Sequence, residues 1–167
     1  MKNAMKYLPS ISALLNLCAL FSFAALASAL VAQYGFNLHP CPLCIYQRIP
    51  YAIIAVIGVF AYFLRGKNGK YYLAVACAAL FFADAGIAVY HTGVEYGWFP
   101  APTTCSSSGG IGQTLEEMRA AIMGAPLVTC AQAMAYIFGL SMAAWNALAA
   151  AAAFVATSFV LWKRRGE

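Results

Sequence analysis

Four apolar stretches, each about 20 residues long, limit what this chain can fold into more than any other feature. A helix of that length crosses about 30 Å of hydrocarbon at about 1.5 Å per residue. Only 9% of the residues are charged, whereas a soluble domain carries charges at about a quarter of its positions. The sequence therefore predicts an all-α membrane protein, a four-transmembrane-helix bundle that forms a single domain over residues 1–167. The predicted helices cover about residues 10–32, 44–64, 71–91 and 141–162.

The basic residues predict how these helices are oriented. Most of the ten lysines and arginines precede the first stretch, lie between the second and third, or follow the fourth. Because basic residues favour the cytoplasmic side, both termini are expected in the cytoplasm. External loops are then expected at about residues 33–43 and 92–140. The long one contains "TLEEMRAAIM", where Thr114 and Glu117 match a capping box and predict a short amphipathic helix on the membrane surface.

The first apolar stretch also has features of a cleaved signal peptide. Lys2 and Lys6 precede it, and "ALASA" near Ala29 resembles a cleavage site. A signal peptide, however, usually has an apolar region of about 7–15 residues, and this one is longer. We favour a retained helix, and cleavage would leave the rest of the topology unchanged.

The six cysteines divide by position. Cys18 and Cys77 lie inside apolar stretches, where cysteine behaves as a small hydrophobic residue. The other four face the external side, on which disulfides form and persist. They are Cys41, Cys44, Cys105 and Cys130.

The stretch "LHPCPLCIYQRIP" contains the pair Cys41 and Cys44. A disulfide between residues three apart closes almost no loop, so this pair is better suited to redox chemistry than to stabilising the fold. Together with His39 the pair could also supply three ligands to zinc or copper. We rank that alternative below redox chemistry and expect no metal. Haem attachment is excluded because Ile45, not histidine, follows Cys44.

The position of Arg48 bears on which molecule reacts with the Cys41–Cys44 pair. If the second helix starts near Cys44, its N-terminus favours a thiolate there, and Gln47 and Arg48 lie on the same face. Arg48 could instead direct its charge to lipid phosphates. A dithiol in lipid needs a two-electron acceptor, and a quinone is the obvious one. Its reduced anion would be stabilised by Arg48.

Three further residues are candidates for the site. Asp84 lies in the third stretch, about 10 Å from its external end by helical rise. A carboxylate inside a membrane segment is a functional candidate. We expect it either to pair with Arg48 or relay protons to the quinone, or to be a protonated carboxyl bonded between helices. His91, near the external end of that stretch, could contact quinone or lie at the interface. Cys105 follows "PTT" and precedes "SSSGG", a composition that suits a sulfur meeting another protein's thiol.

The motifs "CPLCIYQR", "HTGVEYGWFPAPTTC" and "FGLSMAAWN", in this order within four helices, resemble the DsbB family of bacterial thiol:quinone oxidoreductases. The resemblance implies that Cys41 and Cys44 are the quinone-proximal pair, with Arg48 beside them. It implies that Cys105 and Cys130 oxidise a soluble thioredoxin-fold partner of the DsbA type, with Cys105 forming the mixed disulfide. Electrons would end on ubiquinone or menaquinone.

The resemblance also implies where the protein works. We expect a monomer in the bacterial inner membrane, with its active site on the periplasmic face, in contact with lipid and with no nucleic-acid partner. The segment "AQAMAY" after Cys130 is less polar than the family pattern, which leaves the soluble partner open. Three alternatives remain: a vitamin K epoxide reductase-like protein, a metal- or haem-handling protein, and a disulfide-stabilised structural subunit.

Overall fold

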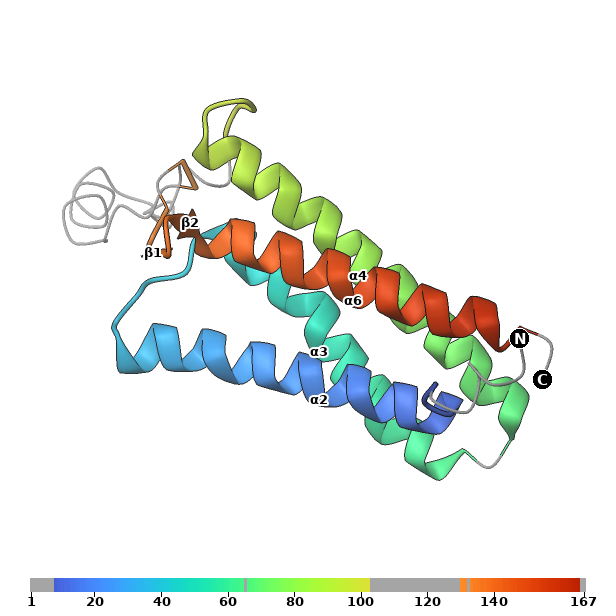
Figure 1. The fold of residues 1–167 in the computed structure, drawn as a ribbon. Coiled ribbons are helices and arrows are strands. Elements are labelled where there is room, and N and C mark those ends of the chain that lie inside the picture. Colours follow the sequence, from blue (N-terminus) through green and yellow to red (C-terminus); the bar gives the residue numbers. More distant parts are fainter. Residues whose placement is uncertain (1–7, 65, 103–129, 132, 166–167) are drawn as a thin grey trace, which may run out of the picture.

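The protein is a bundle of long helices, seen here in a computed structural model that describes residues 8–64, 66–102, 130–131 and 133–165. Within these residues, four helices are long and apolar enough to cross a membrane, as the sequence predicted. The start of α2 and the end of α6 lie at the same end of the bundle (Figure 1). The helices are α2 (Ile11–Leu30), α3 (Pro42–Phe63), α4 (Lys67–Glu95) and α6 (Met142–Lys163).

Two features of the sequence analysis lie outside the described residues. They are the amphipathic helix expected from Thr114 and the cysteine Cys105. The cytoplasmic position of both termini also stays a prediction. What the structure supports is the mainly helical fold with four candidate membrane spans.

The first helix extends further than expected. Ser10 caps its start by accepting a hydrogen bond from the backbone N–H of Ala13 at 3.2 Å. Its last turn continues as a π-helical segment, η1 (Val31–Gly35), so the apolar span ends at residue 35 instead of 32. This extra turn carries Gln33, which takes part in the site described below.

Helix α3 starts earlier than expected, and this corrects the assignment of its N-terminus. Pro42 is the first helical residue and Cys41 is the N-cap, whereas the sequence analysis placed Cys44 at the start. Proline is favoured at a first helical position because it lacks the N–H that would be unpaired there. The unpaired N–H groups at the start of α3 therefore favour negative charge on Cys41 rather than on Cys44.

Helix α4 is 29 residues long and extends beyond the expected range of 71–91 at both ends. At its external end the helix continues to Glu95, and Gly97 then adopts a positive φ of 75°, a conformation that glycine accepts readily. The extension places His91 and Glu95 four residues apart on one helical face.

The apolar core lies among the four helices, towards the cytoplasmic half expected from the charges. The buried rings of Tyr51 and Phe81 meet edge to face, and both also meet the ring of Phe21, which is 38% exposed; the centroids are 5.9–6.2 Å apart. Cys18 and Cys77 are buried in this core, as expected for cysteines that act as small hydrophobic residues. The largest of its fully buried apolar side chains are Leu15, Ile54 and Phe81.

A short β-hairpin precedes α6, which the sequence analysis treated only as loop. Strand β1 (Tyr136–Ile137) pairs antiparallel with β2 (Leu140–Ser141). The two residues between them, Phe138 and Gly139, both have positive φ, the requirement of a two-residue type I′ turn. The Trp145 indole N–H donates to the carbonyl of Ile137 at 2.9 Å and so ties the hairpin to α6.

Candidate active site

Cys41 and Cys44 form a close dithiol at the start of α3. Their Sγ atoms are 3.0 Å apart and both thiols are free. Cys41 is 2% exposed, and its Sγ accepts the backbone N–H of Cys44 at 3.3 Å. Hydrogen bonding with the Cys44 thiol lowers the pKa of Cys41 below that of an ordinary thiol; burial opposes this, and His91 and the Cys44 N–H reinforce it. The sulfur favoured as a thiolate is therefore that of Cys41.

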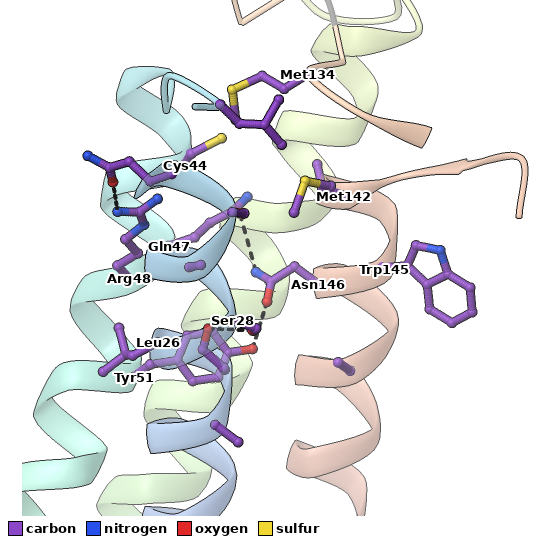
Figure 2. A pocket seen from close by; sticks show the side chains of 18 of the residues that line it. Leu26, Ser28, Cys44, Gln47, Arg48, Tyr51, Met134, Met142, Trp145 and Asn146 are labelled. Atoms are coloured by element: carbon purple, nitrogen blue, oxygen red, sulfur yellow. Dashed lines mark hydrogen bonds between the residues drawn. The ribbon is translucent and has the colours of Figure 1, made fainter. Parts of the chain in front are cut away.

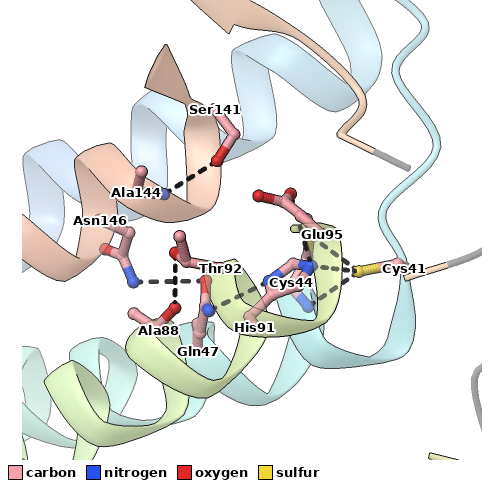
Figure 3. A network of polar contacts seen from close by, with 10 residues as sticks. All are labelled: Cys41, Cys44, Gln47, Ala88, His91, Thr92, Glu95, Ser141, Ala144 and Asn146. Carbon is pink, nitrogen blue, oxygen red and sulfur yellow. Dashed lines mark hydrogen bonds and ion pairs between the residues drawn. The ribbon is translucent and has the colours of Figure 1, made fainter. Parts of the chain in front are cut away.

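His91, from α4, connects the dithiol to the rest of the site (Figure 3). Its Nε2 lies 3.5 Å from Cys41 Sγ and 3.8 Å from Glu95 Oε1. Its Nδ1 lies 3.2 Å from Nε2 of Gln47. The imidazole is buried, so each of its nitrogens faces a protein group rather than solvent.

A chain of polar side chains continues from Gln47 into the bundle. Asn146, from α6, donates through Nδ2 to Gln47 Oε1 at 3.3 Å and to Asp84 Oδ2 at 3.1 Å. The hydroxyl of Tyr51 donates to Asn146 Oδ1 at 2.7 Å. Three helices are thereby joined by one buried hydrogen-bond network that runs from the dithiol to Asp84.

The expected pairing of Asp84 with Arg48 is wrong. Asp84 is fully buried and bonds to Asn146, whereas Arg48 Nη1 donates to Oε1 of Gln33 at 2.6 Å. The reason is the direction of the two side chains: Arg48 reaches Gln33 in the π-helical turn η1, whereas Asp84, on α4, bonds to Asn146 on α6.

A cavity of about 460 Å³ lies beside the dithiol, between α2, α3 and α6. Most of its lining is apolar, and Cys44 reaches it together with four polar side chains from α3 and α6 (Figure 2). These are Gln47, Arg48, Tyr51 and Asn146. Met134 and Ile137 complete the lining from the hairpin side. A volume of this size is typical of a site for a small organic molecule.

His91 does not line this cavity within the part of the chain that the structure describes. Its contacts are with Cys41, Gln47 and Glu95. The sequence analysis gave His91 either a quinone contact or a place at the membrane interface. The described contacts put it beside the dithiol, and a quinone contact stays a prediction.

The second cysteine pair is described in part. Cys130 is fully buried and disulfide-bonded, and its partner is not among the described residues. It packs in one apolar cluster with Cys41, Leu43 and Val94. The loop cysteine therefore lies next to the dithiol of α3, although about 90 residues separate them along the chain.

The same sulfurs also have the arrangement of a partial metal site. The ligand atoms of Cys41, Cys44 and His91 all lie within 4.8 Å of one another. The histidine in this group is His91 and not His39, which is exposed. Two thiolates and one imidazole are three of the four ligands of a tetrahedral zinc site.

A family model described as disulfide bond formation protein DsbB matches residues 12–160. The chain belongs to the DsbB family. Among its relatives, disulfide bond formation protein B of Actinobacillus pleuropneumoniae is 31% identical over 140 residues, which cover 80% of this chain and 75% of the relative. The protein of the same name from Xylella fastidiosa (strain Temecula1) is 30% identical, covering 76% of each chain.

An uncharacterized protein of Rickettsia prowazekii, RP370, is 32% identical and covers 76% of this chain and 74% of its own length. No solved structure matches the chain significantly. Membership of the DsbB family confirms the resemblance seen in the sequence and makes the protein an oxidoreductase of disulfide formation in a multi-pass membrane fold.

Residue-by-residue reading of the DsbB motifs missed three members of the site. Asn146 and Tyr51 lie in apolar stretches, and Glu95 follows His91 by one helical turn. Asn146 had a detectable signal, because an uncharged polar side chain inside a membrane helix commonly bonds across helices. Glu95 would have stood out if the third helix had been extended to residue 95.

Proposed function

We propose that this protein oxidises a soluble thioredoxin-fold dithiol and passes the two electrons to a quinone in the membrane. The observation that carries the proposal is the position of Cys44. It is half of a close dithiol and also lines a largely apolar cavity that contains Arg48. One sulfur of the reacting pair, that of Cys44, thus faces a space suited to a lipid-soluble oxidant.

The residues present fit a quinone head group. The cavity is large enough for one, and Arg48 keeps further guanidinium N–H groups beyond the one given to Gln33. Gln47 and Cys44 would hold the ring with it. A bound quinone would accept two electrons and two protons and leave as quinol.

The dithiol supplies those electrons and protons. Counted from two thiols, joining the sulfurs breaks both S–H bonds, forms the Cys41–Cys44 disulfide and releases two electrons and two protons. When Cys41 is already a thiolate, one of these protons has left beforehand. The sulfurs are 3.0 Å apart, so about 1 Å of movement brings them to the S–S bond length of about 2.05 Å. Cys41, favoured as the thiolate, is the sulfur best prepared to attack.

We propose that Cys130 forms its disulfide with Cys105 and that this pair exchanges with the soluble partner. The partner's dithiol would reduce the Cys105–Cys130 disulfide, and the outer pair would then be reoxidised by the Cys41–Cys44 disulfide. Packing of Cys130 against Cys41 supports this second exchange, because the attacking and receiving sulfurs belong to one cluster. The exchange is expected at the periplasmic face of the inner membrane.

The test is anaerobic mixing of purified protein, a reduced thioredoxin-fold partner and ubiquinone or menaquinone, with quinol followed by absorbance. Cys44→Ser and Cys105→Ser should each abolish quinol formation. Cys18→Ser and Cys77→Ser are matched controls, since both cysteines are buried in the core away from the cavity, and should retain it. Quinol formation that survives Cys44→Ser would refute the proposal.

Metal binding is a second candidate because of the three clustered ligand atoms. It predicts zinc or copper bound to the purified reduced protein and lost in His91→Ala. The redox function predicts bound quinone instead. Elemental analysis together with extraction of quinone from the same preparation separates the two.

A further inference from the structure

We propose that Asp84 is a positioning residue for the dithiol: acting through Asn146 and Gln47, it sets the direction of hydrogen bonds that makes His91 present an Nε2–H group to Cys41. The inference rests on the proposed function only in taking Cys41 as a reacting sulfur. It is built from four side-chain contacts across three helices, two of them buried and two part-buried. Figure 3 shows the three that run from Cys41 to Asn146.

The hydrogen-bond network begins at the carboxyl group of Asp84. Asp84 is fully buried, and its Oδ2 accepts a hydrogen bond from Nδ2 of Asn146 at 3.1 Å. With an acceptor at that oxygen, the amide nitrogen of Asn146 faces Asp84 and its amide oxygen does not. The oxygen then faces Tyr51, whose hydroxyl donates to it at 2.7 Å. Tyrosine can donate or accept, so it accommodates this orientation without setting it.

The orientation of Asn146 decides that of Gln47. The same Asn146 Nδ2 lies 3.3 Å from Gln47, and a donor there requires the Gln47 oxygen to face it. The Gln47 nitrogen must then point the other way, to His91 Nδ1 at 3.2 Å. An amide nitrogen donates, so Nδ1 accepts. In a neutral imidazole the hydrogen must therefore be on Nε2.

The Nε2–H group faces the reacting sulfur. Cys41 Sγ is 3.5 Å away and Glu95 Oε1 is 3.8 Å away, so the sulfur is the nearer acceptor. With the backbone N–H of Cys44 at 3.3 Å, a Cys41 thiolate would have two N–H donors. The other titratable groups here are Glu95, whose Oε1 lies 3.8 Å from His91 Nε2, and Cys44, whose Sγ lies 3.0 Å from Cys41 Sγ.

This role differs from proton transfer and from metal binding. Asn146 and Gln47 are amides, which neither gain nor lose protons near neutral pH, so the network orients groups without carrying protons from Asp84. In the orientation described, Nε2 bears a hydrogen and has no lone pair for a cation. The network therefore favours a thiolate partner for His91 over a metal ligand.

The decisive test exchanges the two ends of the network, in the double variant Asp84→Asn with Asn146→Asp. The exchange conserves volume and composition but reverses the bonds that link position 84 to His91. The carboxylate, now at position 146, accepts from Gln47, and the Gln47 oxygen accepts from His91 Nδ1. The hydrogen then lies on Nδ1, and a lone pair faces Cys41. We expect ¹⁵N NMR to show this change of tautomer, and the profile of Cys41 alkylation by iodoacetamide to move to higher pH, by about one pH unit.

The single variant Asp84→Asn tests the carboxyl group alone. Its side chain offers Asn146 either an amide oxygen or an amide nitrogen, so the direction of the network is no longer fixed and His91 should populate both tautomers. An exchanged variant that keeps the Nε2–H tautomer, or the wild-type alkylation profile, overturns the proposal. If the exchanged variant does not fold, Asp84→Leu replaces it: without the acceptor, His91 should populate both tautomers, and a pure Nε2–H form refutes the role of Asp84. Neither measurement involves quinone or a protein partner, so failure here is distinct from failure of the proposed function.

Discussion

The two sulfurs of the dithiol lie in unequal environments, although they are 3.0 Å apart. Cys41 is at the helix N-cap, where hydrogen bonding with Cys44 lowers its pKa. A group whose pKa is lowered by folding is charged above its folded pKa and loses the associated stability as the pH falls through that value. Alkylation of Cys41 should therefore persist to pH values well below the ordinary thiol range near 8.5, and mass spectrometry of the labelled peptide measures it.

The alkylation profile of Cys41 should be compared between the wild type and His91→Ala, both in the reduced form. Loss of the Nε2–H donor should move the alkylation profile of Cys41 to higher pH, because the thiolate keeps only the hydrogen bonds from Cys44. An unchanged profile would mean that His91 contributes nothing to the charge on this sulfur.

Arg48 is the residue most directly tied to the proposed oxidant. Arg48→Gln should lower kcat/KM for quinone by about ten- to a hundredfold, the range expected for loss of a hydrogen bond from a charged donor. The kcat/KM of Arg48→Lys should lie between those of the wild type and Arg48→Gln. Lysine keeps the positive charge but lacks the planar guanidinium group that also reaches Gln33. Stopped-flow quinone reduction by pre-reduced protein isolates this step, and equal rates in all three proteins would contradict the assignment.

How far the sequence predicts the site depends on whether its parts are near in the chain. Cys44, Gln47 and Arg48 follow from helical spacing within one segment, and the structure places all three at the cavity. Asn146 and Asp84 are 62 residues apart, and their contact depends on how α4 and α6 are rotated about their axes. Helical spacing cannot give that rotation, which is why the pairing of Asp84 with Arg48 failed.

At the scale of helices, a close contact between α2 and α3 depends on the absence of a side chain at Gly58. A Cβ at Gly58 would overlap the Cβ of Ala19, whereas a Cβ at Gly86 on α4 would meet no other atom. Gly58→Ala should therefore lower stability by about 1–3 kcal/mol through overpacking. Gly86→Ala is its control and should be neutral or slightly stabilising, by up to about 1 kcal/mol, because alanine favours the helix.

Thermal unfolding of the two glycine variants in detergent measures the difference. A lower Tm for Gly58→Ala with an unchanged Tm for Gly86→Ala supports a tight α2–α3 contact. Equal Tm values would show that the two helices can separate without cost.

Helix boundaries were predicted less well than helix positions. The expected start of α3 at residue 44 overlooked that Pro42 can occupy the first helical position, and this hid the N-cap role of Cys41. The hairpin was missed because Phe138, a residue that rarely takes positive φ, occupies its turn beside Gly139. Both errors concern local backbone geometry that hydropathy does not report.

For the whole molecule, hydropathy was enough to predict the four-helix fold, because about 20 apolar residues have few alternatives to a membrane helix. It was not enough to predict the cavity, which arises where α2, α3 and α6 diverge around small residues. Those residues include Ala25, Ala29, Ala143 and Ala149. Their role depends on which helices face one another, and this is a property of the assembled bundle.

The orientation of the bundle follows from charge and can be tested with a matched pair of asparagines. Asn37 precedes the dithiol and Asn68 is the second residue of α4, at the opposite end, and both are exposed. In a chain whose own cysteines are replaced by serine or alanine, a membrane-impermeant maleimide should label Asn37→Cys in intact cells and Asn68→Cys only after permeabilisation. The reason is that lysines and arginines flank Asn68 and favour the cytoplasm. The reverse pattern would place the dithiol in the reducing compartment, where a disulfide-forming oxidase could not sustain its oxidised state.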